Sequence, residues 1–185
     1  HLIGSNKIMN QMVSKNKYYS MILWGPPGSG KTTLARIIAK SSKSIIHEIS
    51  AISSGVKDLR NIIDKARANN DNGVSSIIFI DEIHRFNKSQ QDALLHAVEE
   101  GLIILIGATT ENPSFEVINP LLSRCKTLKL KPLNNDALQM ILNQSIKSDI
   151  ILSQKNIDLD KSTQKKLIQY CGGDARKMLN TFEIA

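Results

Sequence analysis

A glycine-rich loop that ends in a lysine and a threonine is the stretch of this sequence that most clearly predicts chemistry. It reads GPPGSGKT, runs from Gly25 to Thr32 and fits the pattern G-x-x-x-x-G-K-[ST]. In such a loop the glycines let backbone N–H groups approach phosphate oxygens, and the N-terminus of the following helix attracts negative charge. Lys31 would reach the β- and γ-phosphates of a nucleotide, and the Thr32 hydroxyl would bind Mg²⁺. The loop therefore predicts a site for a nucleoside triphosphate with magnesium.

The position of this loop favours phosphate binding over an ordinary Gly/Pro turn. It follows the apolar run Met21–Trp24 and precedes a helix-like stretch, and the motif requires this place between a strand and a helix. The residues expected to bind the nucleotide here are Gly25, Pro26, Pro27, Gly28, Ser29, Gly30, Lys31, Thr32 and Thr33.

Two neighbouring acids indicate hydrolysis in addition to binding. They end the apolar stretch IIFIDEIH, which runs from Ile77 to His84. Asp81, at the tip of the predicted strand, is placed to hold the magnesium shell, and Glu82 is placed to activate the attacking water as a general base. Two acids can also end a strand at the surface without any function, but the phosphate loop upstream disfavours that reading.

Three further polar residues could take part, although spacing alone assigns them no role. Thr109 ends the apolar run of LIILIGATTEN, where a hydroxyl could orient the water or touch the γ-phosphate. Arg124 stands in LLSRC, and Arg176 stands in GGDARKMLN. A threonine at a strand end is common, and most arginines are ordinary surface residues.

The elements that must position these residues can be read from the hydrophobic pattern. Short apolar runs alternate with helix-like stretches such as the one in which Leu59, Ile62, Ile63 and Ala66 form one apolar face. The predicted strands are Met21–Trp24, Ile45–Ile49, Ile77–Ile80, Leu102–Ile106 and Lys126–Leu130. The first four are continuously apolar, as expected for strands buried on both faces of a parallel sheet. The pattern predicts a three-layer α/β fold.

Helix boundaries and a change of pattern complete this organisation. Ser89-Gln-Gln-Asp92 resembles a capping box that opens a helix over Gln90–Glu100. After Pro132 only amphipathic helices follow, without another buried strand. We therefore expect a nucleotide-binding core over residues 1–131 and a small helical domain over residues 132–185.

Bulk properties constrain the compartment and the partners. The formal net charge of +7 suits an anionic partner, such as a nucleotide, a nucleic acid or a membrane surface, and equally a surface kept soluble by lysines. Only two cysteines occur, without metal-ligand spacing, which favours a reducing compartment. No apolar run is long enough to span a bilayer, and no signal peptide is visible. We expect a cytoplasmic protein without a membrane partner, and a chain that is a piece of a longer protein because it starts without Met.

Taken together, these segments resemble the AAA+ ATPases of the branch that contains clamp loaders and the Holliday-junction motor RuvB. Within that branch the chain is more similar to the RarA/MgsA family of replication-associated recombination proteins, relatives of the Werner-interacting ATPase. The matching segments are HLIG (His1–Gly4), ILWGPPGSGKTTLA (Ile22–Ala35), SGVKDLR (Ser54–Arg60), FIDEIHRFNKSQQDALL (Phe79–Leu95), IILIGATTENPSFEV (Ile103–Val117), LLSRC (Leu121–Cys125) and GDARKMLNTFE (Gly173–Glu183).

The resemblance implies ATP with Mg²⁺, a five-stranded parallel sheet ordered 5-1-4-3-2 and a helical lid over the nucleotide. It assigns Thr109 to the sensor-1 position, with Thr110 and Asn112 as weaker candidates, and Arg176 to sensor 2. Arg124 corresponds to an arginine finger that enters the site of a neighbouring subunit, which makes the active form a homo-oligomer. The N-terminal match implies that Leu2 and Ile3 line the adenine pocket.

The resemblance further implies action on DNA at stalled replication forks, with single-strand binding protein and the replisome as partners. Lys57 and Arg60, at the start of a predicted helix, could hold DNA phosphates without reading sequence, and an ordinary solvated helix start is an equally good reading. The chain departs from clamp loaders at Ser50, where these often carry an Asn that pairs with the catalytic Glu. A serine hydroxyl could still hold Glu82, but it puts this coupling between DNA and hydrolysis in doubt.

Three functions remain open at this point. The first is a DNA-dependent ATPase of the RarA/MgsA type. The second is a RuvB-like branch-migration motor, which FNKSQQDALL and TTENPSFEV disfavour. The third is a clamp-loader-like subunit that binds ATP as a switch without hydrolysis, and the presence of Lys31, Glu82 and Arg124 argues against it.

Overall fold

The computed structural model describes residues 12, 15, 17–52, 54–148 and 159–184 of the 185-residue chain. The chain divides into two compact units. The first consists of His1–Gly25 and Lys31–Leu130, and the second of Pro26–Gly30 and Lys131–Ala185. The middle of the glycine-rich loop thus groups with the second unit, whereas its two ends belong to the first.

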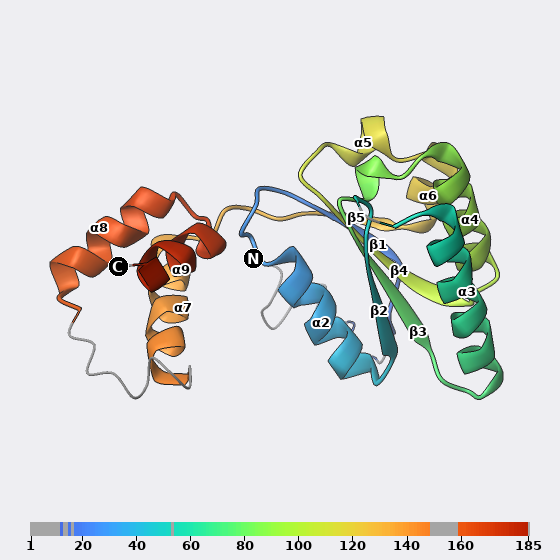
Figure 1. Cartoon of the computed structure of the whole chain (residues 1–185), viewed down its shortest axis with the longest axis horizontal. Coiled ribbons are helices and arrows are strands. Elements are labelled where there is room, and N and C mark those ends of the chain that lie inside the picture. Colours follow the sequence, from blue (N-terminus) through green and yellow to red (C-terminus); the bar gives the residue numbers. More distant parts are fainter. Residues whose placement is uncertain (1–11, 13–14, 16, 53, 149–158, 185) are drawn as a thin grey trace. The chain divides into compact units, whose positions relative to one another are not determined.

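A five-stranded parallel sheet forms the centre of the first unit in the part of the chain that is described (Figure 1). Its strands are β1 (Met21–Trp24), β2 (Ile45–Ser50), β3 (Ser76–Asp81), β4 (Ile103–Thr109) and β5 (Lys126–Lys129). They are ordered β2-β3-β4-β1-β5, so β4 lies between β1 and β3. This confirms the predicted order, which is the same when read from the opposite edge.

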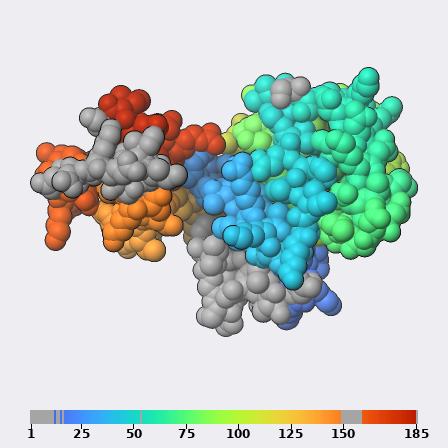
Figure 2. Space-filling view, turned by 60° about the horizontal axis from the view of Figure 1, so that its bottom comes forward, coloured from blue at the N-terminus to red at the C-terminus, as the bar shows by residue number. Residues whose placement is uncertain are grey.

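Helices cover both faces of this sheet, as Figure 1 shows. Helix α2 (Lys31–Ser42) lies on one face, and α3 (Val56–Asp71) and α4 (Lys88–Glu99) lie on the other. The turn η1 (Ile83–Arg85) and the short helices α5 (Pro113–Glu116) and α6 (Asn119–Arg124) complete the unit. The residues of α2, β2 and α3 follow one another across one surface of the core, coloured from blue through cyan to teal in Figure 2.

Two apolar clusters, one on each side of the sheet, explain why the strands are apolar throughout. Along β3, Ile77 and Phe79 pack with the residues of α2, whereas Ile78 and Ile80 pack with those of α3 and α4. All four side chains are at most 2% exposed. Because helices cover both faces of the sheet, a strand with polar residues at alternate positions would bury polar groups in one of the two clusters. Each fully buried Ile side chain contributes about 2 kcal/mol to the free energy of folding.

Helix α4 begins two residues earlier than the sequence pattern predicts. Its N-cap is Asn87, whose side chain accepts a hydrogen bond from the Gln90 N–H at 2.9 Å, while Gln90 Oε1 accepts from the Asn87 N–H at 3.0 Å. The expected capping box at Ser89 was therefore wrong. Asn and Ser are both good N-cap residues, and the reciprocal amide pair is available only from Asn87.

A buried amide fixes the segments that follow η1 and β4. Gln91 is 3% exposed, and its Nε2 donates to the carbonyls of Phe86 at 2.9 Å and Glu116 at 3.1 Å. Its Oε1 accepts from the Ile118 N–H at 2.9 Å. One side chain thus satisfies three backbone groups and ties the start of α6 to α4.

The second unit contains three helices in its described part: α7 (Asn135–Ser148), α8 (Lys161–Cys171) and α9 (Ala175–Ile184). They share a small core of Leu138, Leu142, Ile168, Cys171 and Met178. The hydroxyl and N–H of Thr163, with the Ser162 N–H, lower the pKa of the α8 cap Asp160 to about 2. That these helices act as a lid over a nucleotide stays a prediction.

No helix in the described ranges is long and apolar enough to cross a membrane.

We expect Gln91→Leu to lower the free energy of unfolding by about 2–4 kcal/mol, because it leaves buried backbone groups without partners. The measurement is urea denaturation followed by circular dichroism. Gln169→Leu is the matched control, since Gln169 is exposed on α8. Equal urea midpoints for the two variants would show that the buried hydrogen bonds of Gln91 do not stabilise the fold.

Candidate active site

The carboxyl ends of β1, β3 and β4 bring the candidate residues to one edge of the sheet. In register, Trp24 of β1 lies opposite Thr109 of β4, and Ile80 of β3 lies opposite Gly107. After β1 the chain passes to α2 on one face, whereas after β3 and β4 it passes to the other. Such a divergence at the carboxyl edge of an α/β sheet is where ligands bind.

The entry of the glycine-rich loop is joined directly to β4. The Gly25 N–H donates to the Thr109 carbonyl at 3.2 Å. Gly25 has a φ of +154°, and a Cβ there would overlap the Leu130 carbonyl oxygen. Only glycine leaves room for this close approach to Leu130, which directly follows β5. This contact explains why the first residue of the motif is a glycine.

Lys31 begins α2 and is held within the same unit. Its Nζ donates to the Gly25 carbonyl at 2.9 Å, and the residue is only 8% exposed. A buried ammonium needs partners of this kind, and phosphate oxygens would be stronger ones. The lysine is therefore positioned at the loop entry, next to the end of β1.

The middle of the loop combines glycine conformations with a local hydrogen bond. Gly28 and Gly30 have φ values of +64° and +89°, and the Ser29 hydroxyl donates to the Pro26 carbonyl at 2.8 Å. Glycine adopts positive φ without steric cost, and loops built this way can turn several N–H groups toward one anion. This backbone suits the predicted phosphate binding.

The two acids stand at a strained junction. Asp81 is the last residue of β3, and its carbonyl accepts from the Ala51 N–H at 3.1 Å. Glu82 follows with φ 57° and ψ 45°, in the left-handed region, which costs a non-glycine residue about 1–2 kcal/mol. This turn directs the chain from β3 into η1. Strain of this kind concentrates at functional sites, so it is consistent with a functional Glu82.

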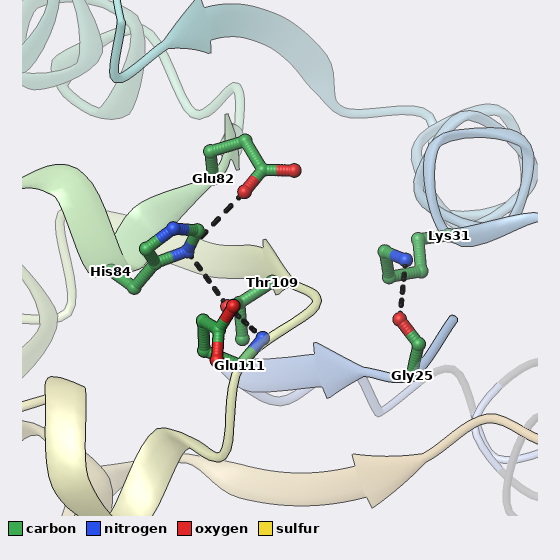
Figure 3. Close-up of polar contacts among 6 residues, drawn as sticks. All are labelled: Gly25, Lys31, Glu82, His84, Thr109 and Glu111. Atoms are coloured by element: carbon green, nitrogen blue, oxygen red, sulfur yellow. Dashed lines mark hydrogen bonds and ion pairs between the residues drawn. The ribbon is translucent and has the colours of Figure 1, made fainter. Parts of the chain in front are cut away.

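A histidine connects Glu82 to Thr109. His84 Nδ1 lies 2.8 Å from Thr109 Oγ1 and 3.3 Å from Glu82 Oε2. Thr109 is fully buried, and its Oγ1 also accepts from the Glu111 N–H at 3.0 Å. Figure 3 shows the three side chains converging at the strand ends, with Lys31 and Gly25 beyond them.

Sequence reasoning missed the contacts of His84. Among the described residues, Glu82 is paired with His84 and not with Ser50, which lies opposite Asp81 at the end of β2. The signal available in the sequence was the position of His84 two residues after Glu82. Only the left-handed turn at Glu82, however, brings the imidazole back toward the carboxylate.

The oxygen groups at this edge fit a magnesium nucleotide. Thr32 is the second residue of α2, and Asp81 ends β3. No cluster of three or more His, Cys, Asp or Glu residues that could hold a metal occurs among the described residues. Mg²⁺ commonly takes one or two protein oxygens and completes its shell with phosphate oxygens and water, and Thr32 and Asp81 would supply such oxygens.

Arg124 lies at the surface of the first unit and contacts residues of its own chain. Its Nη2 lies 2.9 Å from Glu99 Oε1, and its Nη1 donates to the Ser123 hydroxyl at 2.7 Å. Its side chain is 48% exposed. Burial raises the pKa of the adjacent Cys125 thiol to about 12, so this cysteine stays protonated and is no nucleophile.

The remaining candidates lie elsewhere. Lys57 and Arg60 are exposed on α3, and Lys57 is the second residue of this helix. Arg176 is exposed in the first turn of α9, in the second unit. Thr33 is exposed on α2, whereas Leu2 and Ile3 lie outside the described residues.

The glycine-rich loop, the acidic end of β3 and the sheet order are together typical of the AAA+ ATPases that the sequence resembles. Comparison with family models gives the same class. Residues 21–133 match the ATPase family associated with various cellular activities (AAA), and the chain belongs to this family. The predicted family resemblance is thereby confirmed.

At the level of individual proteins, the whole chain is similar to replication-associated recombination protein A, with 47% identity in Coxiella burnetii and 44% in Escherichia coli K12. It is 45% identical over 184 residues to the ATPase WRNIP1 of Dictyostelium discoideum. The chain spans 42%, 41% and 21% of the lengths of these three proteins.

Among solved structures, the fold is similar to that of the Thermotoga maritima RuvB Holliday junction branch migration motor. The TM-score is 0.72 at 26% identity, and the match covers 93% of this chain and 56% of that one. This similarity agrees with the strand order described above.

We expect Lys31→Ala to weaken binding of ATP by about 100-fold or more, because the variant loses a charge-assisted contact with the phosphates. The measurement is titration with a fluorescent ATP analogue in the presence of Mg²⁺. Lys40→Ala, an exposed position near the end of the same helix, should bind like the unaltered chain. Similar affinities for both variants would remove Lys31 from the site.

Proposed function

We propose that the protein hydrolyses ATP with Mg²⁺ and uses the energy to act on DNA during replication and recombination. The observation that supports this most directly is the pairing of the Glu82 carboxylate, through His84, with the buried hydroxyl of Thr109. That hydroxyl belongs to the residue whose carbonyl holds the entry of the phosphate loop. A general base and a phosphate sensor are thus joined at the strand ends that carry the loop.

The proposed mechanism divides the work among named side chains. Loop N–H groups and Lys31 would hold the β- and γ-phosphates, while Thr32 and Asp81 would hold Mg²⁺, which would supply positive charge to the phosphate oxygens. Glu82 takes a proton from the attacking water. Thr109 contacts the γ-phosphate or that water. Together these groups position the reactants and stabilise the transition state.

Two arginines would complete the site. Arg124 is half exposed at the end of α6, which is suitable for insertion into the site of a second copy of the chain. There its charge would stabilise the developing negative charge, an effect of roughly 10³–10⁵ in rate for such fingers. We propose that Arg176 reaches the γ-phosphate from the helices α7–α9, which would act as a lid. The role of Arg124 requires assembly of two copies of the chain, and the role of Arg176 requires closure of the lid.

DNA as the substrate rests on similarity to relatives named for replication and recombination. The exposed Lys57 and Arg60 near the start of α3 suit contacts with phosphates, which carry no sequence information. We further propose stalled forks as the site of action, single-strand binding protein and the replisome as partners, and a cytoplasmic location. The fold similarity to RuvB keeps a branch-migration motor as the second candidate.

Glu82→Gln should keep ATP affinity and lower turnover by about 10²–10⁴, since the glutamine amide cannot accept the proton of water. The measurement is phosphate release at saturating ATP, with binding measured in parallel. Glu116→Gln, an exposed acid on α5, is the control and should hydrolyse ATP normally. Normal turnover by Glu82→Gln would show that the general base lies elsewhere.

Arg124→Ala should bind ATP normally but lose the part of the turnover that rises with protein concentration. In the full-length protein, we expect this part also to be stimulated by forked DNA. Mixing Arg124→Ala with Glu82→Gln should restore some activity, because a subunit with an intact base then receives an arginine from its neighbour. No recovery in the mixture, or a loss of affinity like that of Lys31→Ala, would place Arg124 in its own subunit's site.

A further inference from the structure

We propose that His84 is a positioning residue that donates its Nδ1–H to both Thr109 and Glu82, so that the sensor hydroxyl keeps its own proton for the bound nucleotide. This inference rests on the proposed ATP hydrolysis and specifies how the base and the sensor are coupled. It depends on the three distances around His84 and Thr109 and on a count of protons and lone pairs.

The hydroxyl of Thr109 has one proton and two lone pairs. One lone pair accepts the Glu111 N–H at 3.0 Å. The second partner is His84 Nδ1 at 2.8 Å, and either atom could supply the proton of this bond. The position of Glu82 decides between the two arrangements.

Glu82 Oε2 lies 3.3 Å from the same Nδ1. If Nδ1 carried no proton, its lone pair would face a carboxylate oxygen, and the two would repel each other. If Nδ1 carries the proton, a single N–H lies between two acceptors, the hydroxyl and the carboxylate, and both contacts are favourable. The geometry therefore selects the protonated Nδ1.

The consequence for Thr109 is that both of its lone pairs are occupied by N–H donors. Its proton is then left for a third group, and because the side chain is fully buried, the hydroxyl has to turn or shift slightly to reach that group. A phosphate oxygen or the attacking water would accept this proton. Because the donor role is set before any ligand binds, the sensor hydroxyl is preorganised for an anion.

The consequence for Glu82 is coupling to the sensor. The shared N–H is closer to Thr109, at 2.8 Å, than to the carboxylate, at 3.3 Å. Any movement of the hydroxyl toward a γ-phosphate would weaken its share of this N–H and strengthen the share of Glu82. His84 would thus hold the base most firmly when the nucleotide engages Thr109. In the described part of the chain, Glu82 pairs with His84, whereas Ser50, the residue considered for this function, lies opposite Asp81 at the end of β2.

Two substitutions separate this role from general packing. The amide nitrogen of Asn lies the same number of bonds from Cα as His Nδ1, whereas that of Gln corresponds to Nε2. We expect His84→Asn to keep turnover within about fivefold of the unaltered protein, and His84→Gln to lower kcat by about 100-fold, since misplacing a catalytic group by about 1 Å has an effect of this size. For both, the affinity for ATP should change less than threefold.

The assay uses the full-length protein with Mg²⁺ and ATP, and includes His96→Gln, an exposed position on α4, as the control. Equal turnover by His84→Asn and His84→Gln, whether normal or impaired, would overturn the inference. Loss of ATP affinity in both variants would also overturn it, because His84 would then be a structural residue.

A second measurement does not depend on variants. The ¹⁵N spectrum of the unaltered protein, labelled at histidine, reports which ring nitrogen carries the proton. A protonated Nδ1 on His84 supports the inference, and a bare Nδ1 excludes it.

Glu82→Gln in the same assay distinguishes the two levels of the argument. If Glu82→Gln is inactive while His84→Gln is normal, only the inference about His84 fails. If Glu82→Gln is itself active, the proposed general base fails, whatever the His84 variants do.

Discussion

The hydrogen bond between the Gly25 N–H and the Thr109 carbonyl is the contact on which the candidate site depends. It joins the entry of the phosphate loop to the end of β4, and β4 can lie there only because the sheet places it between β1 and β3. Lys31 bonds to the same glycine, and the side chain of the same threonine leads through His84 to Glu82. A change in strand order would separate the loop from the acids, even with every motif residue retained.

Within this frame, local strain and local hydrogen bonds act together at the end of β3. The left-handed conformation of Glu82 turns the chain at once, and so His84 comes back over the strand ends. A relaxed conformation at Glu82 would continue the strand direction and carry the imidazole away from Thr109. The cost of about 1–2 kcal/mol at one residue is offset by the buried apolar contacts of Ile83 and Phe86 directly after it.

Much of the fold was predictable because its signals are local. Continuous apolar runs identify strands that are buried on both faces, and GPPGSGKT and the Asp81-Glu82 pair indicate chemistry by residue type and spacing alone. The start of α4 was missed because Asn87 and Ser89 are both suitable caps, and only the paired amides decide between them. The contacts of His84 and of Arg124 were not predictable. The contact of His84 with Thr109 and that of Arg124 with Glu99 each join residues 25 positions apart, and they depend on a turn and on helix packing that no short pattern encodes.

The ion pair between Arg124 and Glu99 has a consequence for the proposed assembly. Both side chains are more than a third exposed, so their attraction is screened by water and contributes only about 0.2–1 kcal/mol. Insertion of Arg124 into a neighbouring site would exchange this partner for another anion and leave the number of ion pairs nearly constant. In the proposed assembly, such an exchange would make subunit contact depend on the charge of the bound nucleotide, so that loss of the γ-phosphate would return the arginine to Glu99. Assembly would then be reversible and would follow the nucleotide state of each site.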